Sequence, residues 1–116
     1  MIQARRNPPE EPHDAEGFNE RGNRYSRNGV YERAIGDYTQ AIEMDGNFAD
    51  AYFNRGVSYY EMGQNEAAIA DLTRAIELDP KDDNFYSRRS LAYLFNDQLE
   101  LAQADEEKCQ EIRDAG

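Results

Sequence analysis

Residues 49–82, ADAYFNRGVSYYEMGQNEAAIADLTRAIELDPKD, match the 34 residues that precede them (15–48) at fourteen positions. The recurring residues include Arg21/Arg55, Gly22/Gly56, Tyr25/Tyr59, Ala34/Ala68, Ile35/Ile69 and Asp37/Asp71. A fixed period of this length indicates one supersecondary unit that is used several times. Proteins built in this way stack their units and present extended surfaces, so the repeat favours a binding function over catalysis.

Apolar residues three or four positions apart predict that each unit is a pair of helices. In residues 15–48 the first stripe contains Phe18, Gly22 and Tyr25, and the second runs from Tyr31 to Ile42. Turns are expected at Asn28-Gly29, Met62-Gly63 and Asn96-Asp97. Small residues at Gly22, Gly56 and Ser90 would let the two helices of a pair approach closely. The pattern therefore predicts an all-α fold, an α-solenoid of three antiparallel helix-turn-helix repeats.

The expected organisation is a disordered tail (1–14) followed by three units, 15–48, 49–82 and 83–116. The third unit is degenerate. Its last helix carries Gln103, Glu106 and Gln110 where the earlier units have mostly apolar residues. A polar outer face is what a terminal repeat requires, so this helix is expected to act as a cap that ends the solenoid within this chain.

Composition excludes several classes of partner. The net charge of −11, with only two lysines, argues against nucleic acid and anionic lipid, which bind clustered Lys and Arg. No apolar stretch is long enough to span a bilayer, and the N-terminus does not have the form of a secretory signal. The one cysteine, Cys109, cannot form an internal disulfide and is expected to be a small buried hydrophobe. We expect a cytoplasmic protein without membrane association, monomeric, with self-association as the alternative.

No pattern of catalytic or metal-ligating residues is present in the sequence. The single histidine, His13, falls in the predicted tail, with no residue nearby to orient it as a base. The run from Asp79 to Asn84 lacks the glycine and the final glutamate of a calcium loop and is better explained as a helix stop followed by an N-cap at Asp82. We therefore expect no enzymatic activity, no cofactor and no metal.

The unit resembles the tetratricopeptide repeat, and the resemblance covers about residues 15–114. The second unit matches best, and the matching residues are Tyr52, Gly56, Tyr59, Ala68, Leu72, Ala75 and Pro80. The first unit has Gly46 in place of the usual proline, and the third keeps Tyr86, Tyr93 and Ala102. The resemblance implies a non-enzymatic protein-interaction module or scaffold whose first helices line a concave groove for a peptide segment or a partner helix.

Carrying the phase of the family over gives the groove-facing positions of this chain. The expected binding residues are Asn19, Asn23, Phe53, Asn54, Val57, Tyr60, Asn84, Arg88, Leu91 and Phe95. The apolar members of this set would supply contact area, while Asn23, Asn54 and Arg88 would orient polar main chain or a carboxylate.

Two alternatives remain open. Some members of the family clamp the terminal carboxylate of cytosolic heat-shock chaperones with a Lys, two Asn, a second Lys and an Arg. The matching positions here are Asn19, Asn23, Asn54, Asn84 and Arg88, so both lysines are replaced by asparagine and the implied clamp is incomplete. In the other alternative, the array is a structural element that packs within a larger protein or self-associates.

Overall fold

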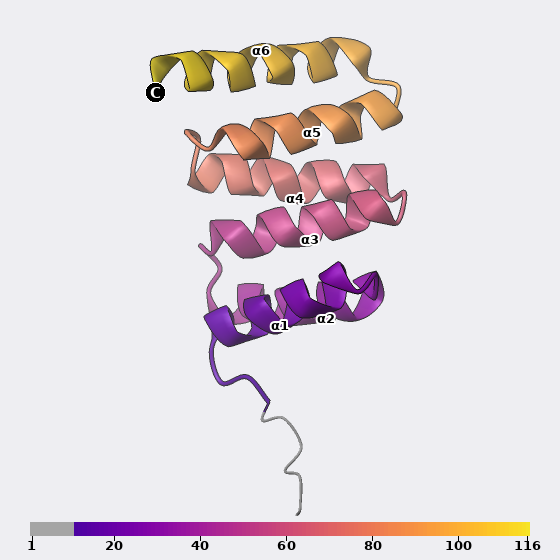
Figure 1. Cartoon of the computed structure of the whole chain (residues 1–116), viewed down its shortest axis with the longest axis vertical. Helices are drawn as coiled ribbons and strands as arrows, with labels where there is room; N and C mark the ends of the chain where they lie inside the picture. Colours follow the sequence, from indigo (N-terminus) through magenta and orange to yellow (C-terminus); the bar gives the residue numbers. More distant parts are fainter. Residues whose placement is uncertain (1–10) are drawn as a thin grey trace, which may run out of the picture.

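The computed structural model describes residues 11–116, which form six helices joined by short turns (Figure 1). The helices are α1 (Ala15–Arg27), α2 (Tyr31–Met44), α3 (Ala49–Glu61), α4 (Asn65–Leu78), α5 (Asp83–Phe95) and α6 (Leu99–Ala115). The described residues contain no strand, and the prediction of an all-α helical repeat is confirmed. Most of the predicted N-terminal tail, positions 1–10, lies outside the described residues.

The helix ends follow local sequence signals. The Asp14 carboxylate accepts a hydrogen bond from the Gly17 amide at 2.7 Å, and Asp82 accepts one from the Asn84 amide at 3.0 Å. Both are N-caps, which satisfy amides that a helix leaves unpaired. The hairpin turns place Gly29 and Gly63 at φ of 75° and 77°, a conformation that glycine adopts without steric cost. The third turn uses Asp97 at the equivalent position, with φ of 59°.

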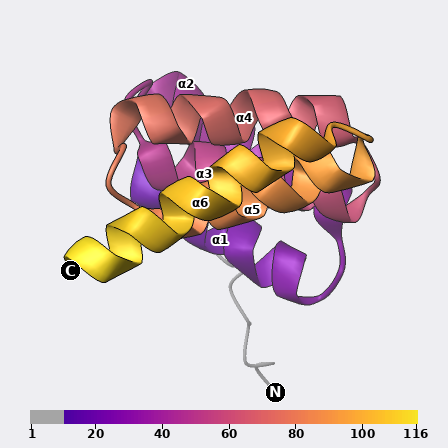
Figure 2. The ribbon, with the colours of Figure 1, turned by 90° about the horizontal axis from the view of Figure 1, so that it is seen from above.

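The hairpins stack along one axis, so that the described chain is elongated, with extents of 66 × 27 × 23 Å. Each helix packs mainly on the helices before and after it in sequence. Viewed along the stacking axis, α2 and α4 lie on one side, and α1, α3 and α5 lie on the other (Figure 2). The first helices of the three hairpins therefore form a continuous layer.

Small residues set the close approach within each hairpin. A Cβ atom built on Gly22 would lie 2.6 Å from Cε1 of Tyr38, and one on Gly56 would lie 3.0 Å from Cγ of Leu72. In the third hairpin the Ser90 hydroxyl donates to the Ala102 carbonyl at 2.9 Å. The predicted contact positions are confirmed, and at the first of them even a methyl group would force the Tyr38 ring to shift.

An arginine and an aspartate sixteen residues apart join the two helices of every hairpin. The pairs are Arg21–Asp37, Arg55–Asp71 and Arg89–Asp105, each with two hydrogen bonds of 2.7 or 2.8 Å. Arg55 and Arg89 also donate to Thr39 and Thr73 of the preceding hairpin, at 3.1 Å each. These arginines therefore connect both the helices of a hairpin and neighbouring hairpins.

Helix α6 has the polar outer face that the sequence predicts. Gln103, Glu106 and Gln110 are exposed, whereas Cys109 is 2% exposed within the core, as expected for a small buried hydrophobe. None of the helices among residues 11–116 combines the length and apolar character needed to cross a membrane.

Candidate functional site

The predicted binding residues lie on α1, α3 and α5, whose shared surface we call the α1–α3–α5 face. They follow the helical period along each helix, for example Asn84, Arg88, Leu91 and Phe95 on α5. Contacts between helices confirm that several of these residues are neighbours across the layer. The face contains three distinct parts: a cluster of amides, an apolar middle and an exposed apolar end.

The amide cluster consists of Asn19, Asn23 and Asn54. Nδ2 of Asn54 donates to Oδ1 of Asn19 at 3.0 Å, and this bond joins α3 to α1. Asn19 is only 9% exposed, so its side chain is held in place by the helices around it. The pairing of these two amides is a feature that the sequence pattern did not reveal.

Asn23 is held by Tyr38, which reaches it from α2. The Tyr38 hydroxyl donates to Oδ1 of Asn23 at 2.6 Å. Burial of the ring raises the pKa of Tyr38 to about 12, so the hydroxyl keeps its proton at neutral pH and remains a donor. The Nδ2 group of Asn23 donates to no other residue within 11–116, so it is available as a donor.

Arg88 and Asn84 lie on the neighbouring helix α5, and both are exposed. The Arg88 guanidinium forms no ion pair or hydrogen bond with any residue from Glu11 to Gly116. Six arginines and lysines of that range form ion pairs, namely Arg21, Arg55, Arg74, Arg89, Lys108 and Arg113. Like Arg88, the side chains of Arg24, Arg27, Arg33 and Lys81 form none there. Arg88 is thus a cation whose donors are available to a ligand.

The apolar middle of the face contributes to packing between hairpins. Phe53 packs against Phe85, with ring centroids 5.0 Å apart, and is partly buried against a core cluster. Val57 and Leu91 are also only partly exposed. Phe53 therefore holds α3 against α5 as well as contributing surface.

The exposed apolar end is formed by Tyr60, Leu94 and Phe95. The Tyr60 and Phe95 rings meet edge to face, with centroids 5.8 Å apart and planes at 67°. Phe95 is 63% exposed and Leu94 is 46% exposed. A cavity of about 330 Å³ adjoins the two rings and is also lined by Glu61, Gly63 and Asn65.

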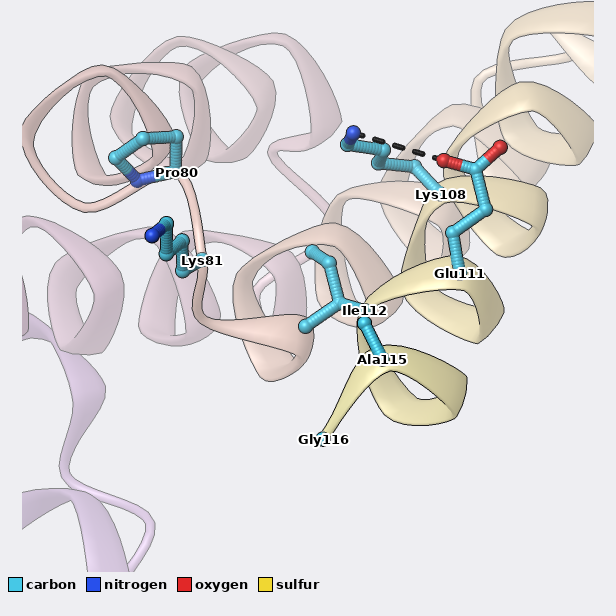
Figure 3. Close-up of a pocket in the computed structure, with 7 residues that line it drawn as sticks. All are labelled: Pro80, Lys81, Lys108, Glu111, Ile112, Ala115 and Gly116. Atoms are coloured by element: carbon cyan, nitrogen blue, oxygen red, sulfur yellow. Dashed lines mark ion pairs between the residues drawn. The ribbon is translucent and has the colours of Figure 1, made fainter.

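A larger cavity, of about 560 Å³, lies away from this face, between the α4–α5 loop and the end of α6 (Figure 3). Its walls include Pro80, Ile112 and Ala115, together with Lys81 and Lys108. These are the only two lysines of the chain, and Lys108 pairs with Glu111 at 3.6 Å. The sequence pattern predicts the helix stop at Pro80 but does not indicate a cavity beside it.

The described residues offer no evident site for a metal. No group of three or more His, Cys, Asp or Glu side chains within residues 11–116 is arranged to hold an ion. The chemistry that α1, α3 and α5 present is hydrogen bonding by amides, apolar contact, and exposed guanidinium groups at Arg24, Arg27 and Arg88 that pair with no other residue within 11–116.

Two family models match the chain: a tetratricopeptide repeat model over residues 49–82 and a TPR repeat model over residues 22–63. Among solved structures, the second TPR of Spaghetti (RPAP3) bound to the HSP90 peptide SRMEEVD is 35% identical, with a TM-score of 0.83. That match covers 85% of this chain and 92% of the other. The second TPR domain of human RPAP3 in complex with the HSP70 peptide SGPTIEEVD is 34% identical, with a TM-score of 0.84, and the match covers 88% and 85% of the two chains. A comparison with curated proteins gave no match.

Proposed function

The chain belongs to the tetratricopeptide repeat family, and on this basis we propose that it is a non-enzymatic interaction module that holds a peptide segment or a partner helix on its α1–α3–α5 face. Its fold presents a layer of three helices on which a cluster of amides, a partly buried apolar middle and an exposed apolar end lie together. A single buried thiol suits a reducing compartment, so we place the module in the cytoplasm.

The exposed apolar end of the face is the observation that carries this proposal. Leu94 and Phe95 are 46% and 63% exposed, although the equivalent positions of the first hairpin are the polar Ser26 and Arg27. Large apolar side chains left on a surface beside polar groups are typical of interaction sites. Aromatic residues in such a patch commonly supply much of the binding free energy.

The structural relatives support the same type of function. The Spaghetti and human RPAP3 domains are described as bound to, or in complex with, peptides that end in EEVD. This supports peptide binding by the present chain.

The test is to select binders from a library of random peptides and to measure their affinity for the wild-type protein and three variants. Phe95→Ala is expected to weaken binding by about 2 kcal/mol, roughly thirtyfold. Leu101→Ala is the matched control, because Leu101 is a similarly exposed apolar residue on α6. The proposal fails if no peptide is enriched, or if Phe95→Ala and Arg88→Ala both leave the affinity unchanged.

The alternatives make different predictions. If the array is a structural element, it self-associates or packs on other domains, and Leu99 and Leu101, exposed at 61% and 47%, would be covered. Sedimentation over a concentration series distinguishes a monomer from such an assembly. If the chain binds a chaperone terminus like a co-chaperone, Arg88 must do so without the two lysines of a complete clamp.

A further inference from the structure

We propose that copies of this chain associate head to tail, with α1 of one copy docking on α6 of another in the register that joins consecutive hairpins within the chain. The inference goes beyond the proposed function, because it concerns the two ends of the stack and not the α1–α3–α5 face. These ends lie at opposite extremes of the elongated molecule, with α1 and α2 at one and α6 at the other (Figure 1). Its basis is a set of contacts that recurs at the internal junctions, together with the charges found at the same positions of the two open ends.

Each internal junction, α2 with α3 and α4 with α5, contains one hydrogen bond from an arginine to a threonine. Arg55 donates to Thr39 at 3.1 Å, and Arg89 donates to Thr73 at 3.1 Å. One repeat of 34 residues further along the chain, the acceptor position falls on Glu107 of α6. A helix that docked on α6 in the same register would therefore bring an arginine to Glu107.

The first arginine of the series already bonds a carboxylate in this way. Arg21 belongs to the first described hairpin, and its Nη1 group donates to Glu11 at 2.9 Å, where Arg55 and Arg89 use a threonine. The Glu11 side chain is 74% exposed, so water and other acceptors compete with this bond. Glu107 of a second copy offers Arg21 the same type of acceptor.

A second position supplies a pair of opposite charges. Ala92 of α5 and Leu72 of α4 belong to one core cluster across the α4–α5 junction, and both are 0% exposed. The position of Ala92 corresponds to Arg24 in α1, and the position of Leu72 corresponds to Glu106 in α6. Arg24 and Glu106 are both exposed, and neither forms an ion pair within residues 11–116. The same register therefore places Arg24 of one copy beside Glu106 of another.

The signs of these charges distinguish a contact surface from a simple cap. A cap requires only a polar outer face, whatever the charge of its residues. Here α1 carries Arg21 and Arg24, whereas α6 carries Glu106 and Glu107 at the facing positions. Complementary charges fix the register of a contact and disfavour wrong partners. Because α1 meets α6 and not a second α1, the contact is heterologous and the association can continue beyond a dimer.

The net charge of −11 sets the conditions under which this contact forms. Copies repel one another at low ionic strength, but at about 0.15 M salt the Debye length of about 8 Å limits charge interactions to neighbouring groups. A polar contact between two helices is also small, so we expect a weak association, with Kd on the order of 0.1–1 mM. Docking must also displace Glu11 and the neighbouring Pro12, which lies against Gly17 of α1, so this segment competes with a second copy.

Sedimentation equilibrium of the full chain tests the proposal, at about 0.15 M NaCl and from about 20 µM to about 2 mM protein. The weight-average mass of wild type should rise with concentration and exceed that of a dimer at the upper limit. Arg24→Glu and Glu106→Arg should each weaken the association by about tenfold or more. The matched controls are Arg33→Glu and Glu66→Arg, which make the same charge changes at exposed positions of α2 and α4 and should associate at least about as tightly as wild type.

Mixing the two defective proteins separates the proposed contact from a general effect of charge. In the mixture, α1 of the Arg24→Glu protein can dock on α6 of the Glu106→Arg protein with opposite charges again facing each other. The remaining junction, α1 of the second protein on α6 of the first, keeps the wild-type pair. Association of the mixture should therefore return to within about threefold of wild type.

Glu11→Gln tests the competition for Arg21. It removes the carboxylate that Arg21 now bonds and should strengthen self-association by about threefold. Glu66→Gln loses the same charge at an exposed position of α4 and should not have this effect. An equal change in the two variants would mean that Glu11 does not occupy the docking position.

Each other outcome overturns the inference. A wild-type mass that stays at that of a monomer up to about 2 mM leaves α6 as a cap and nothing more. Association that survives either reversal, or that mixing fails to restore, places the contact on another surface. Peptides selected for the α1–α3–α5 face should bind the Glu106→Arg protein with unchanged affinity, because α6 is not part of that face. Failure of this inference is therefore distinguishable from failure of the proposed function.

Discussion

Arg55 and Asp71 are joined by two hydrogen bonds, from Nε to Oδ2 at 2.7 Å and from Nη2 to Oδ1 at 2.8 Å. The two side chains are only 19% and 9% exposed, so little water competes with this pair. The bonds to Asp71 raise the pKa of Arg55 above its ordinary value. Equivalent pairs in the other two hairpins make this a repeated element of the fold.

Replacing Asp71 with asparagine should destabilise the protein by about 3 kcal/mol, because it leaves a largely buried guanidinium without its counter-ion. Urea unfolding followed by circular dichroism measures this loss. The control is Glu77→Gln, which breaks the exposed pair Arg74–Glu77 and should leave the free energy of unfolding unchanged. Equal effects of the two substitutions would contradict a special role for the buried pair.

Two glycines in helix interiors should respond oppositely to alanine. Gly22→Ala places a Cβ atom 2.6 Å from the Tyr38 ring and should cost about 2 kcal/mol through overpacking. Gly36→Ala meets no atom within 4 Å and should stabilise the protein by about 0.5–1 kcal/mol, because alanine is the better helix former. Thermal unfolding of both variants gives the comparison. A loss of stability in Gly36→Ala would show that the helix α2 surface is not open there.

The stability of the protein should fall between pH 10 and pH 12. Burial raises the pKa of Tyr38 from 10.0 to about 12, so in this interval the unfolded chain loses the Tyr38 proton and the folded chain keeps it. Stability is therefore complete below pH 10 and decreases as the pH rises, by about 2 kcal/mol. Denaturant unfolding at several pH values measures the decrease.

Tyr38→Phe is the control for this pH dependence. It removes the ionising group, so the variant should show a smaller decrease above pH 10, although it loses the bond to Asn23 and is less stable by about 1 kcal/mol at neutral pH. Parallel pH profiles of the variant and wild type would mean that Tyr38 is not the group responsible.

The Cys109 thiol should be unreactive in the folded protein. It is 2% exposed, and burial raises its pKa, so both access and the thiolate population are low. Reaction with Ellman's reagent should be slower in buffer than in concentrated urea by about 100-fold or more. Comparable rates in the two conditions would place this thiol on a mobile part of α6.

Much of the fold could be predicted because its signals are local. The 34-residue period, the apolar stripes and the turn residues specify helices and their lengths, and these follow from backbone geometry alone. The equivalence of Cys109 to Ala41 and Ala75 correctly placed it in the core. The recurrence of Arg21/Arg55 and Asp37/Asp71 was visible too, but their pairing required the helices to be packed against each other.

Only part of the candidate site could be predicted from the sequence. The period places Asn19, Asn54 and Arg88 on the same layer, but it does not show that Asn19 and Asn54 bond to each other while Arg88 stays available. The period also assigns Phe53 and Phe95 to the same predicted binding face. In the structure, however, Phe53 packs against Phe85, whereas Phe95 is exposed. The binding role of all these residues stays a prediction.

The sequence by itself determined the repeating unit, the helical class and the residues that share a helix face, since each depends on spacing along the chain. Only the tertiary structure decided which side chains of neighbouring hairpins touch, and therefore which amides, cations and rings remain available to a partner. The reason is that helix periodicity fixes the direction of a side chain, whereas its burial and bonding depend on the distance and angle at which the next helix packs.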